Sequence, residues 1–314
     1  EYLTEADWAG ILGLILGLGA LTVLLEEGHR EEWFESSFIR WLTLIAVIGF
    51  SSLIYGQMNA PKPVLKLRLL LDRQFGSVAV MGLALGMVMY GSTYVIPQFL
   101  AVISDYNAFQ TGLVIFWMGI PAFLLMPVLP FMIRRIHIRI AVGAGMLLMA
   151  ISCFVSISLT AQSGGAVFTE GQLIRGVGMI LSMMFLNQAT VASVAKADAG
   201  DASGIFNAAR NLGGSFALAG LASFQDQRIW HHSRRMEESL NANSVSVQNH
   251  LDGLARNFGG MDGAMAMLSR TIQREAFVMT YNDVFLAMGI LTLATVPLVV
   301  FLKPLPKNAS LSMH

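Results

Sequence analysis

Apolar residues occur along this chain in eight long blocks separated by shorter polar stretches. Each block is long enough to cross about 30 Å of hydrocarbon as a helix. Helix is the expected conformation because a segment in lipid must satisfy its backbone polar groups within itself. The alternating pattern of membrane barrel strands is absent. The blocks are residues 8–25, 41–55, 76–100, 111–133, 138–160, 171–195, 203–224 and 276–302.

The composition supports a membrane protein. Hydrophobic residues make up 55% of the chain, charged residues 13%, and the mean hydropathy is +0.62. In a typical soluble domain roughly a quarter of the residues are charged, so much of the surface of this protein is expected to face lipid. We therefore predict an all-α integral membrane protein with about eight transmembrane helices. A formal net charge of zero gives no reason to expect a nucleic-acid partner.

The placement of lysine and arginine predicts how the chain is oriented. Short cytoplasmic loops carry an excess of these residues. If the N-terminus is cytoplasmic, the inner loops hold ten of them and the short outer loops hold only Arg30 and Arg40. Both ends are therefore expected in the cytoplasm. The ten inner residues are Lys62, Lys66, Arg68, Arg73, Arg134, Arg135, Arg139, Lys196, Lys303 and Lys307.

The blocks fall into two groups along the chain. Residues 1–58 hold two spans, and residues 59–75 form a connector in which prolines precede a basic amphipathic stretch on the inner membrane surface. Residues 76–302 hold six spans, with an extracytoplasmic loop at 226–275 that has room for one or two short amphipathic helices. Residues 303–314 form a cytoplasmic tail. The chain opens at Glu1 without a basic signal sequence, and we expect it to be part of a longer protein.

Ionisable residues inside the spans narrow the chemistry. All six histidines lie outside the blocks, and Asp283 is the one acid placed within a span. This pattern offers no metal cluster and no nucleophile beside a base, which disfavours an enzyme and predicts no cofactor. The pair His231 and His232, close to Glu237 and Glu238, has the residue types of a metal site. A solvated loop is the preferred interpretation of that pair.

Two arginines lie inside predicted spans, Arg175 near the start of block 171–195 and Arg210 about two turns into block 203–224. A charge at that depth costs roughly 2.5 kcal/mol or more, so it normally faces a bundle interior or a wet cavity. The alternative is that each side chain reaches back to the nearer lipid headgroups. That alternative is easier for Arg175 than for Arg210.

Further polar residues are candidates for the lining of a substrate cavity. Tyr90, Tyr94 and Gln98 recur at four-residue spacing and form one stripe on a helix. Asn187 and Gln188 in one block, and the asparagines beside Arg210 in the next, are placed to face the same space. Ordinary packing explains any one of them equally well. The complete set of candidates is Tyr90, Tyr94, Gln98, Arg175, Asn187, Gln188, Asn207, Arg210 and Asn211, with Asp283 as a possible proton-linked group.

The order of several motifs resembles the C-terminal part of a major facilitator superfamily transporter, specifically the 14-span drug:proton antiporters of the EmrB/QacA type. The first two spans match the extra linker spans of that subfamily, with Asp7 and Gly10 at the start and a Leu-Leu exit followed by Gly28 and Trp33. The stretch 63–75 is similar to the family's basic connector. The resemblance runs through essentially the whole chain.

Within the six-span part the resemblance is uneven. Asn207, Arg210 and the segment 213–215 resemble the subfamily's Asn-x-x-Arg-x-x-Gly-Ser pattern. Arg175 stands where an Arg-x-x-x-Gly motif is expected, but the glycines give only a loose match. The stretch 134–139 is similar to the superfamily's basic inner-loop motif and lacks its Gly and Asp, which puts a gating role there in doubt.

The resemblance implies proton-driven export of drugs or other amphipathic small molecules across a bacterial inner membrane. In Gram-negative relatives it also implies docking with a periplasmic adaptor and an outer-membrane channel. A proton-coupled step needs a titratable group in the pathway, and these spans supply almost none. We therefore expect the proton-carrying acids to lie in a missing N-terminal half, with Asp283 the only local candidate. The chain by itself is not expected to transport.

Two alternatives to drug export stay open. One is an exporter of a specific metabolite such as a siderophore or an organic acid, which an arginine facing the cavity would favour. The other is a non-transporting scaffold or receptor whose 226–275 segment binds a partner. The scaffold predicts a structured polar loop and a bundle without a wet cavity.

Overall fold

The computed structural model describes residues 7–60, 63–239, 245–257 and 260–302, and every regular element within them is helical. Eight long helices each overlap one of the predicted blocks, which confirms the all-α membrane fold class. They are α1 (Trp8–Glu27), α2 (Ser37–Asn59), α3 (Arg73–Val102), α4 (Ala108–Leu125), α6 (Ile138–Val155), α7 (Phe168–Ala192), α8 (Ala199–Ser239) and α10 (Met261–Thr295). The shorter elements are α5 (Leu129–Arg135), α9 (Val245–Asn257), and the 3-10 turns η1 (Trp33–Glu35), η2 (Leu67–Leu71), η3 (Gly165–Val167), η4 (Lys196–Asp198) and η5 (Val296–Phe301).

Six of the long helices in the described residues are long and apolar enough to cross a membrane: α1, α2, α3, α4, α6, and α10 taken together with η5. Helices α7 and α8 are not among them. Helix α7 carries Gln172 and Arg175, both buried, and α8 carries charged residues along its outer half. The two polar residues of α7 are sheltered by neighbouring helices, whereas Arg234, Glu237 and Glu238 in the outer half of α8 are exposed.

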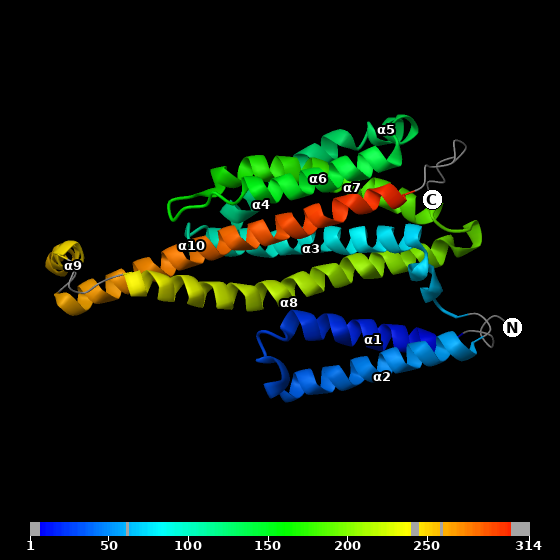
Figure 1. Ribbon diagram of the computed structural model, residues 1–314, viewed down its shortest axis with the longest axis horizontal. Coiled ribbons are helices and arrows are strands. Elements are labelled where there is room, and N and C mark those ends of the chain that lie inside the picture. The colour runs from blue at the N-terminus through cyan, green and yellow to red at the C-terminus, as the bar shows by residue number, and fades with distance from the viewer. Residues whose placement is uncertain (1–6, 61–62, 240–244, 258–259, 303–314) are drawn as a thin grey trace.

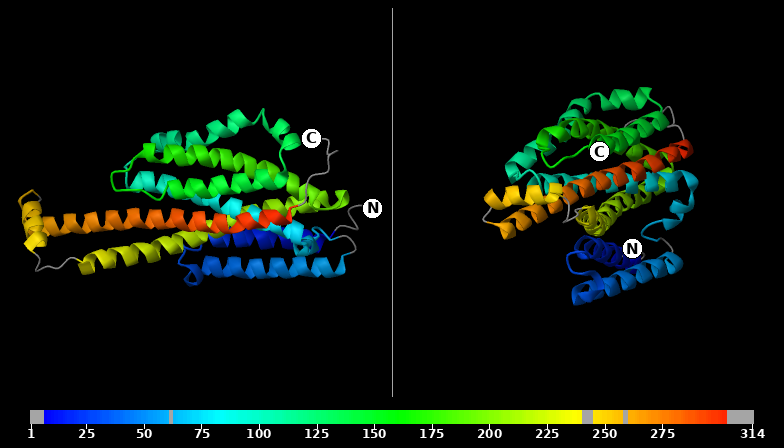
Figure 2. Two further views of the ribbon diagram at one scale, coloured as in Figure 1. Left: turned by 45° about the horizontal axis from the view of Figure 1, so that its top comes forward. Right: turned by 60° about the vertical axis from the view of Figure 1, so that its left-hand side comes forward.

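The helices form two packed groups (Figure 1). One is the α1–α2 pair, and the other, called the six-helix group, consists of α3, α4, α6, α7, α8 and α10 with the short helices α5 and α9. Helices α1 and α2 lie together as a pair beside α8, and α4, α5, α6 and α7 gather on the other side of α3 and α10. Helices α8 and α10 run beyond the others to reach α9, as Figure 2 also shows. The start of α1 and the end of η5 lie at the opposite end of the molecule from α9.

Large aromatic side chains form the core of the six-helix group. Phe99 on α3 meets Phe168 on α7 and Tyr281 on α10 edge to face, with ring centroids 5.4 and 5.2 Å apart. All three rings, and that of Phe285, are 1% exposed or less. Such aromatic pairs stabilise packing beyond the area they bury, so these rings fix α3, α7 and α10 relative to one another.

Glycine contacts hold α1 and α2 together. A Cβ placed on Gly49 would lie 2.3 Å from the backbone nitrogen of Gly17, and one on Gly13 would lie 2.5 Å from that of Leu53. Small residues of this kind let two helices in a membrane approach backbone to backbone. At the base of the pair, the Asp7 carboxylate accepts a hydrogen bond from Gly10 at 2.7 Å and caps α1.

The α1–α2 pair touches the six-helix group along α8. Leu24, Leu25 and Ile39 pack against Ala219. The Ser215 hydroxyl donates to Glu26 Oε1 at 3.1 Å. Further out, His29 Nε2 and Asp226 Oδ2 are 3.3 Å apart.

The connector is anchored to the six-helix group as well as to α2. Leu65 and Leu69 pack against Phe75 and the first turns of α8, and Lys66 forms an ion pair with Asp198 in η4. The side chain of Gln57 donates to the carbonyl of Leu65. The amphipathic stretch therefore turns apolar residues toward the protein as well as toward the expected membrane surface.

Four predicted boundaries differ from the structure. Block 111–133 is divided into α4 and α5 by a turn at 126–128, beside Pro127 and Pro130, because proline removes a helix hydrogen bond and clashes with the preceding turn. Helix α6 ends at Val155 rather than at residue 160, and α10 gives way to η5 after Thr295. Most of segment 226–275 is helix rather than loop, since α8 continues to Ser239 and α10 begins at Met261. The expected short amphipathic helix is present there as α9, whereas the predicted tail, 303–314, lies outside the described residues.

Candidate functional site

A seam of direct backbone contact between α3 and α8 brings the predicted site helices together. A Cβ on Gly86 would lie 1.9 Å from the carbonyl oxygen of Arg210, and one on Gly213 would lie 2.1 Å from that of Leu83. The Tyr90 ring lies against Gly214 in the same way. Any side chain at these glycines would force α3 and α8 apart. The lack of side chains there therefore sets the distance between the candidate residues on α3 and those on α8.

Tyr94 and Gln98 line a small pocket of about 160 Å³ toward the α9 end of the bundle. The side-chain amide of Gln225 on α8 donates a hydrogen bond to the side-chain oxygen Oε1 of Gln98 at 3.0 Å. Tyr281, from α10, also lines this pocket, and its buried hydroxyl has no hydrogen-bond partner among the described residues. His29 reaches the pocket from the end of α1. Three helices, α3, α8 and α10, and the turn after α1 therefore meet around a small polar space.

Arg210 lies away from this pocket, on the part of α8 that faces α7. Its Nη1 approaches the sulfur of Met183 on α7 at 3.8 Å, and it has no acidic partner within the described part of the chain. Asn207 and Asn211 are exposed, and Asn207 bonds only to its own helix at Ser203, 3.0 Å away. Asn187 and Gln188 are half-buried on α7. The predicted cavity residues thus divide between two regions, and their common role stays a prediction.

Arg175 is buried between α6 and α7 at 1% exposure. Its Nη1 donates to Gln172 at 2.8 Å, and its Nε donates to the Ser152 hydroxyl at 3.3 Å. The remaining terminal nitrogen, Nη2, has no partner among the described residues. A solute would reach this guanidinium only after α6 and α7 moved apart, so in this conformation it serves mainly to join the two helices.

Asp283 lies within α10 and is bound by two residues of α8. Arg228 Nη2 is 2.6 Å from Asp283 Oδ2, and His232 Nε2 is 2.7 Å from the same oxygen. His232 is 6% exposed, while the other two side chains are about a quarter to a third exposed. The cluster ties α8 to α10. Asp283 lies within its predicted block, whereas Arg228 and His232 lie beyond residue 224, the predicted end of theirs.

Sequence reasoning missed Gln225, Arg228 and His232 as partners of the predicted site. They follow one another at i, i+3 and i+7, which places them on one face of a helix. That signal is visible in the sequence only if the helix is continued past residue 224, where the apolar block ends. Among the described residues no group of three or more His, Cys, Asp or Glu side chains is placed to hold a metal ion.

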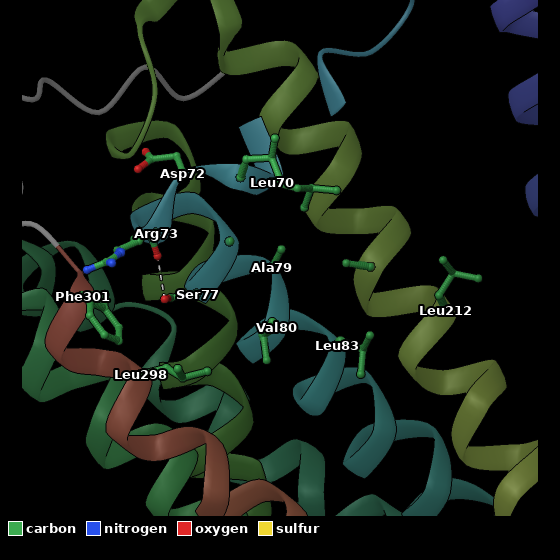
Figure 3. Close-up of a pocket in the computed structure, with 13 residues that line it drawn as sticks. Leu70, Asp72, Arg73, Ser77, Ala79, Val80, Leu83, Leu212, Leu298 and Phe301 are labelled. Atoms are coloured by element: carbon green, nitrogen blue, oxygen red, sulfur yellow. Dashed lines mark hydrogen bonds between the residues drawn. The ribbon is translucent and has the colours of Figure 1, made fainter. Parts of the chain in front are cut away.

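A larger groove of about 640 Å³ lies at the end of the bundle that carries the connector (Figure 3). Its floor is the exposed side of α3, and its walls come from α8, η5 and the end of η2. In Figure 3 the Arg73 side chain runs toward the segment that carries Phe301. The lining residues are Leu70, Leu71, Asp72, Arg73, Gly76, Ser77, Ala79, Val80, Leu83, Ala209, Leu212, Leu298 and Phe301.

Comparisons with known proteins agree with this architecture. Residues 3–218 match the family described as Major Facilitator Superfamily. The chain is 27% identical over 94% of its length to the colistin resistance protein EmrB of Acinetobacter baumannii, and covers 59% of that protein. It is 25% identical to the fatty acid resistance protein FarB of Neisseria gonorrhoeae (96% of this chain, 59% of that one). The multidrug export protein EmrB of Escherichia coli K12 is also 25% identical (95% and 58%).

These matches confirm the resemblance to EmrB-type exporters. They extend through about 95% of the chain, so α1 and α2 are matched together with the six-helix group. The chain spans less than three fifths of the length of these curated relatives.

Proposed function

The chain belongs to the major facilitator superfamily, and from that premise we propose that it is the C-terminal part of a proton-driven exporter of drugs or other amphipathic small molecules. The observation that carries the proposal is the match to relatives named for multidrug export and fatty acid resistance through nearly all of this chain. Helices α3 to α10 would form one half of an alternating-access transporter. The other half, with most of the proton-carrying acids, would lie in the longer protein.

The backbone seam between α3 and α8 suits that role. Helices that touch through glycine can slide or rotate past one another, because few long side chains interdigitate and hold them to a particular rotation. Arg210 lies half-buried beside α7 and is matched only by a methionine sulfur, which is a weak acceptor. A guanidinium without an acid partner is suited to a solute carrying negative charge or good acceptors.

That feature of Arg210 also favours the second candidate, export of one class of organic acid rather than of many drugs. Amphipathic acids fall within both proposals, and the name of the gonococcal relative is compatible with them. The two candidates are separated by the charge dependence of the solutes exported. A drug exporter accepts cationic dyes, whereas an acid exporter prefers anions of similar size.

We further propose that both ends of the chain are cytoplasmic, as the count of basic residues predicts, and that α9 lies on the outer side. In a Gram-negative cell the paired ends of α8 and α10 would then enter the periplasm, where an adaptor is expected to dock. A membrane-impermeant maleimide applied to intact cells tests this orientation. A cysteine at exposed Glu35 should react and one at exposed Arg135 should not, while native Cys153 is 0% exposed and adds no background.

Export of a cationic dye from cells that express the full-length protein tests the proposed function. Expression should lower dye accumulation, and a protonophore should restore it. Arg210→Ala should abolish export while the protein still inserts into the membrane at normal yield. Arg135→Ala is the matched control, because that guanidinium stacks on the Phe131 ring at 5.0 Å, away from α7 and α8. Unchanged accumulation on expression would count against drug export, and normal export by Arg210→Ala would show that the arginine only reaches lipid headgroups.

A further inference from the structure

The groove between α3, α8 and η5 combines an apolar floor with positive charge at its rim. Val80, Leu83 and Leu212 line the floor, and its volume of about 640 Å³ lies in the range of roughly 300–1,000 Å³ that holds small ligands. The groove forms because α10 packs on α8 near α9 and then crosses toward α6, so that η5 stands apart from α8 over the first turns of α3 (Figures 1 and 3).

The surface around the groove is suited to hydrocarbon. Leu71 is 82% exposed, Val300 67%, Val80 48% and Phe301 46%. All four are large apolar side chains on segments predicted to lie in or at the membrane. The groove therefore opens sideways onto the region that acyl chains occupy, and a chain lying in it would cover apolar surface that neighbouring helices leave bare.

The Arg73 guanidinium lines the connector end of the groove, and that of Arg139, outside the lining, lies next to it at Leu302. Within the described residues the Arg73 guanidinium takes part in no ion pair or hydrogen bond; only its backbone carbonyl is used, as the acceptor for Ser77. Arg139 on α6 donates its Nε to the carbonyl of Leu302 at 2.6 Å, directly after Phe301. Both terminal nitrogens of Arg139 make no bond in the described chain, so each arginine has donors to offer.

One acid is also present at the rim, and it is already engaged. The Asp72 carboxylate caps α3 by accepting a hydrogen bond from the backbone N–H of Gln74 at 3.4 Å. The 30-residue α3 begins directly after it, and its first turn carries the positive end of the helix dipole. The rim therefore offers two guanidinium groups and a helix N-terminus against one capping carboxylate.

We propose that this groove binds one anionic phospholipid from the adjoining leaflet. An acyl chain lies along Val80, Leu83 and Leu212, and the headgroup phosphate meets Arg73 and Arg139. Guanidinium recognises phosphate through paired hydrogen bonds, and a juxtamembrane cation adds attraction for anionic lipid. Bound in this way, the lipid fills the space between η5 and α8 and holds the end of α10 against α3.

Native mass spectrometry of the full-length protein, equilibrated with phosphatidylglycerol and phosphatidylcholine of identical acyl chains, tests the proposal. The protein should retain phosphatidylglycerol in preference. Arg73→Gln should reduce that preference about fivefold, since one cation near anionic lipid is worth about this much. Arg73→Lys should keep most of it. Arg135→Gln, which removes a cation from the same end of the bundle away from the groove, should leave the preference within twofold.

A second pair of variants tests the acyl-chain part of the site. Val80→Trp places an indole in the groove and should lower retention of both lipids at least fivefold. Leu113→Trp adds the same indole at a 52% exposed position of α4 and should change neither. Equal retention by Val80→Trp and the unmodified protein would overturn the site. So would stoichiometric displacement of phosphatidylglycerol by oleate, which would mark the groove as a site for exported amphiphiles. Both measurements are made without transport, so failure of dye export would leave them unaffected.

Discussion

The α1–α2 pair and the six-helix group are packed by different means, although both are apolar helices in one membrane. In the pair, the contact consists of glycine backbones, and most large side chains point outward, as Leu12, Ile15 and Ile48 do at 55–62% exposed. In the six-helix group, aromatic rings from α3, α7 and α10 interlock at 1% exposure or less. Helix α3 takes part in both kinds of contact, through Gly86 in its seam with α8 and through Phe99 in the aromatic cluster.

This difference indicates where each part can yield. A contact between smooth helix backbones offers little resistance to sliding, whereas interlocked rings must leave their rotamers before the helices can shift. The α1–α2 pair is expected to behave as a unit that docks on α8 and can be loosened without unfolding the remainder. The six-helix group also contains glycine contacts, in the α3–α8 seam and where Gly176 on α7 meets the Met118 carbonyl on α4, but there they are surrounded by large side chains.

Gly86→Leu should produce the largest effect because it strikes that seam inside the larger group. The new Cβ would lie 1.9 Å from the Arg210 carbonyl oxygen, so α3 and α8 must separate at the centre of the bundle. We expect destabilisation of about 3 kcal/mol, seen as a fall of roughly 6–12 °C in the melting midpoint of the full-length protein. Gly220→Leu on α8 is the control, since its Cβ meets nothing within 4 Å. Equal midpoints for the two variants would contradict the seam.

Gly49→Leu should have the next largest effect, confined to the α1–α2 pair. Its Cβ would lie 2.3 Å from the Gly17 nitrogen and force the two helices apart. Trp8, Trp33 and Trp41 belong to this pair, so their emission reports on it once all other tryptophans are replaced by phenylalanine. That signal should change at a temperature several degrees lower, while the main melting transition stays in place. Gly19→Leu, which meets nothing within 4 Å, should leave both transitions unchanged.

The polar contact between the pair and α8 should contribute a smaller energy. Ser215 donates to Glu26 at 3.1 Å in a partly buried setting, and a double-mutant cycle of Ser215→Ala with Glu26→Gln should give a coupling of about 1 kcal/mol. The half-exposed pair His29 and Asp226 should couple by less than about 1 kcal/mol, because water screens it. Coupling of the second pair above that of the first would show that the outer contact, not the inner one, holds the helices to α8.

The smallest expected effect concerns the connector. Asp198 accepts a hydrogen bond from Lys66 and, through this bond and its charge, raises the pKa of the Lys66 ammonium above its usual 10.5. A raised folded-state pKa gives stability that is fully present below 10.5 and is lost as the pH rises through the folded value. Lys66→Met should therefore lower the melting midpoint slightly and by a constant amount around neutral pH. The difference should shrink only in strong alkali, and Arg68→Met, which breaks no ion pair among the described residues, should show no such convergence.

The sequence predicts helices well where lipid is the expected solvent. Every apolar block corresponds to a long helix, and α1 begins at Trp8 as expected, because about twenty apolar residues in hydrocarbon have few alternatives to a helix. The outer halves of α8 and α10 were missed since they are polar, and hydropathy does not distinguish a solvated helix from a loop. Pro127 and Pro130 lie within block 111–133, but hydropathy alone does not show that a full turn separates α4 from α5 there.

The candidate site was predictable only in part, for a related reason. Tyr94 and Gln98 share a pocket, as their spacing suggested. Asp283 was found as the acid within a span, but its partners Arg228 and His232 lie 55 and 51 residues away, on a helix that was thought to have ended. Arg175 and Arg210 looked alike in sequence, and only packing separates the fully buried arginine from the half-buried one.

The length of α8 and α10 means that a small rotation at one end of these helices gives a larger displacement at the other. Helix α8 has 41 residues, which corresponds to about 60 Å, twice the thickness of the hydrocarbon core at about 30 Å. The contacts of Asp283 on α10 with Arg228 and His232 join α8 to α10, so the two helices are expected to move together. A rotation of about 10° at the membrane surface would carry the far end, some 30 Å away, through about 5 Å. If the bundle rocks as the proposed alternating-access mechanism requires, a small rotation would thus become a large displacement at the α9 end.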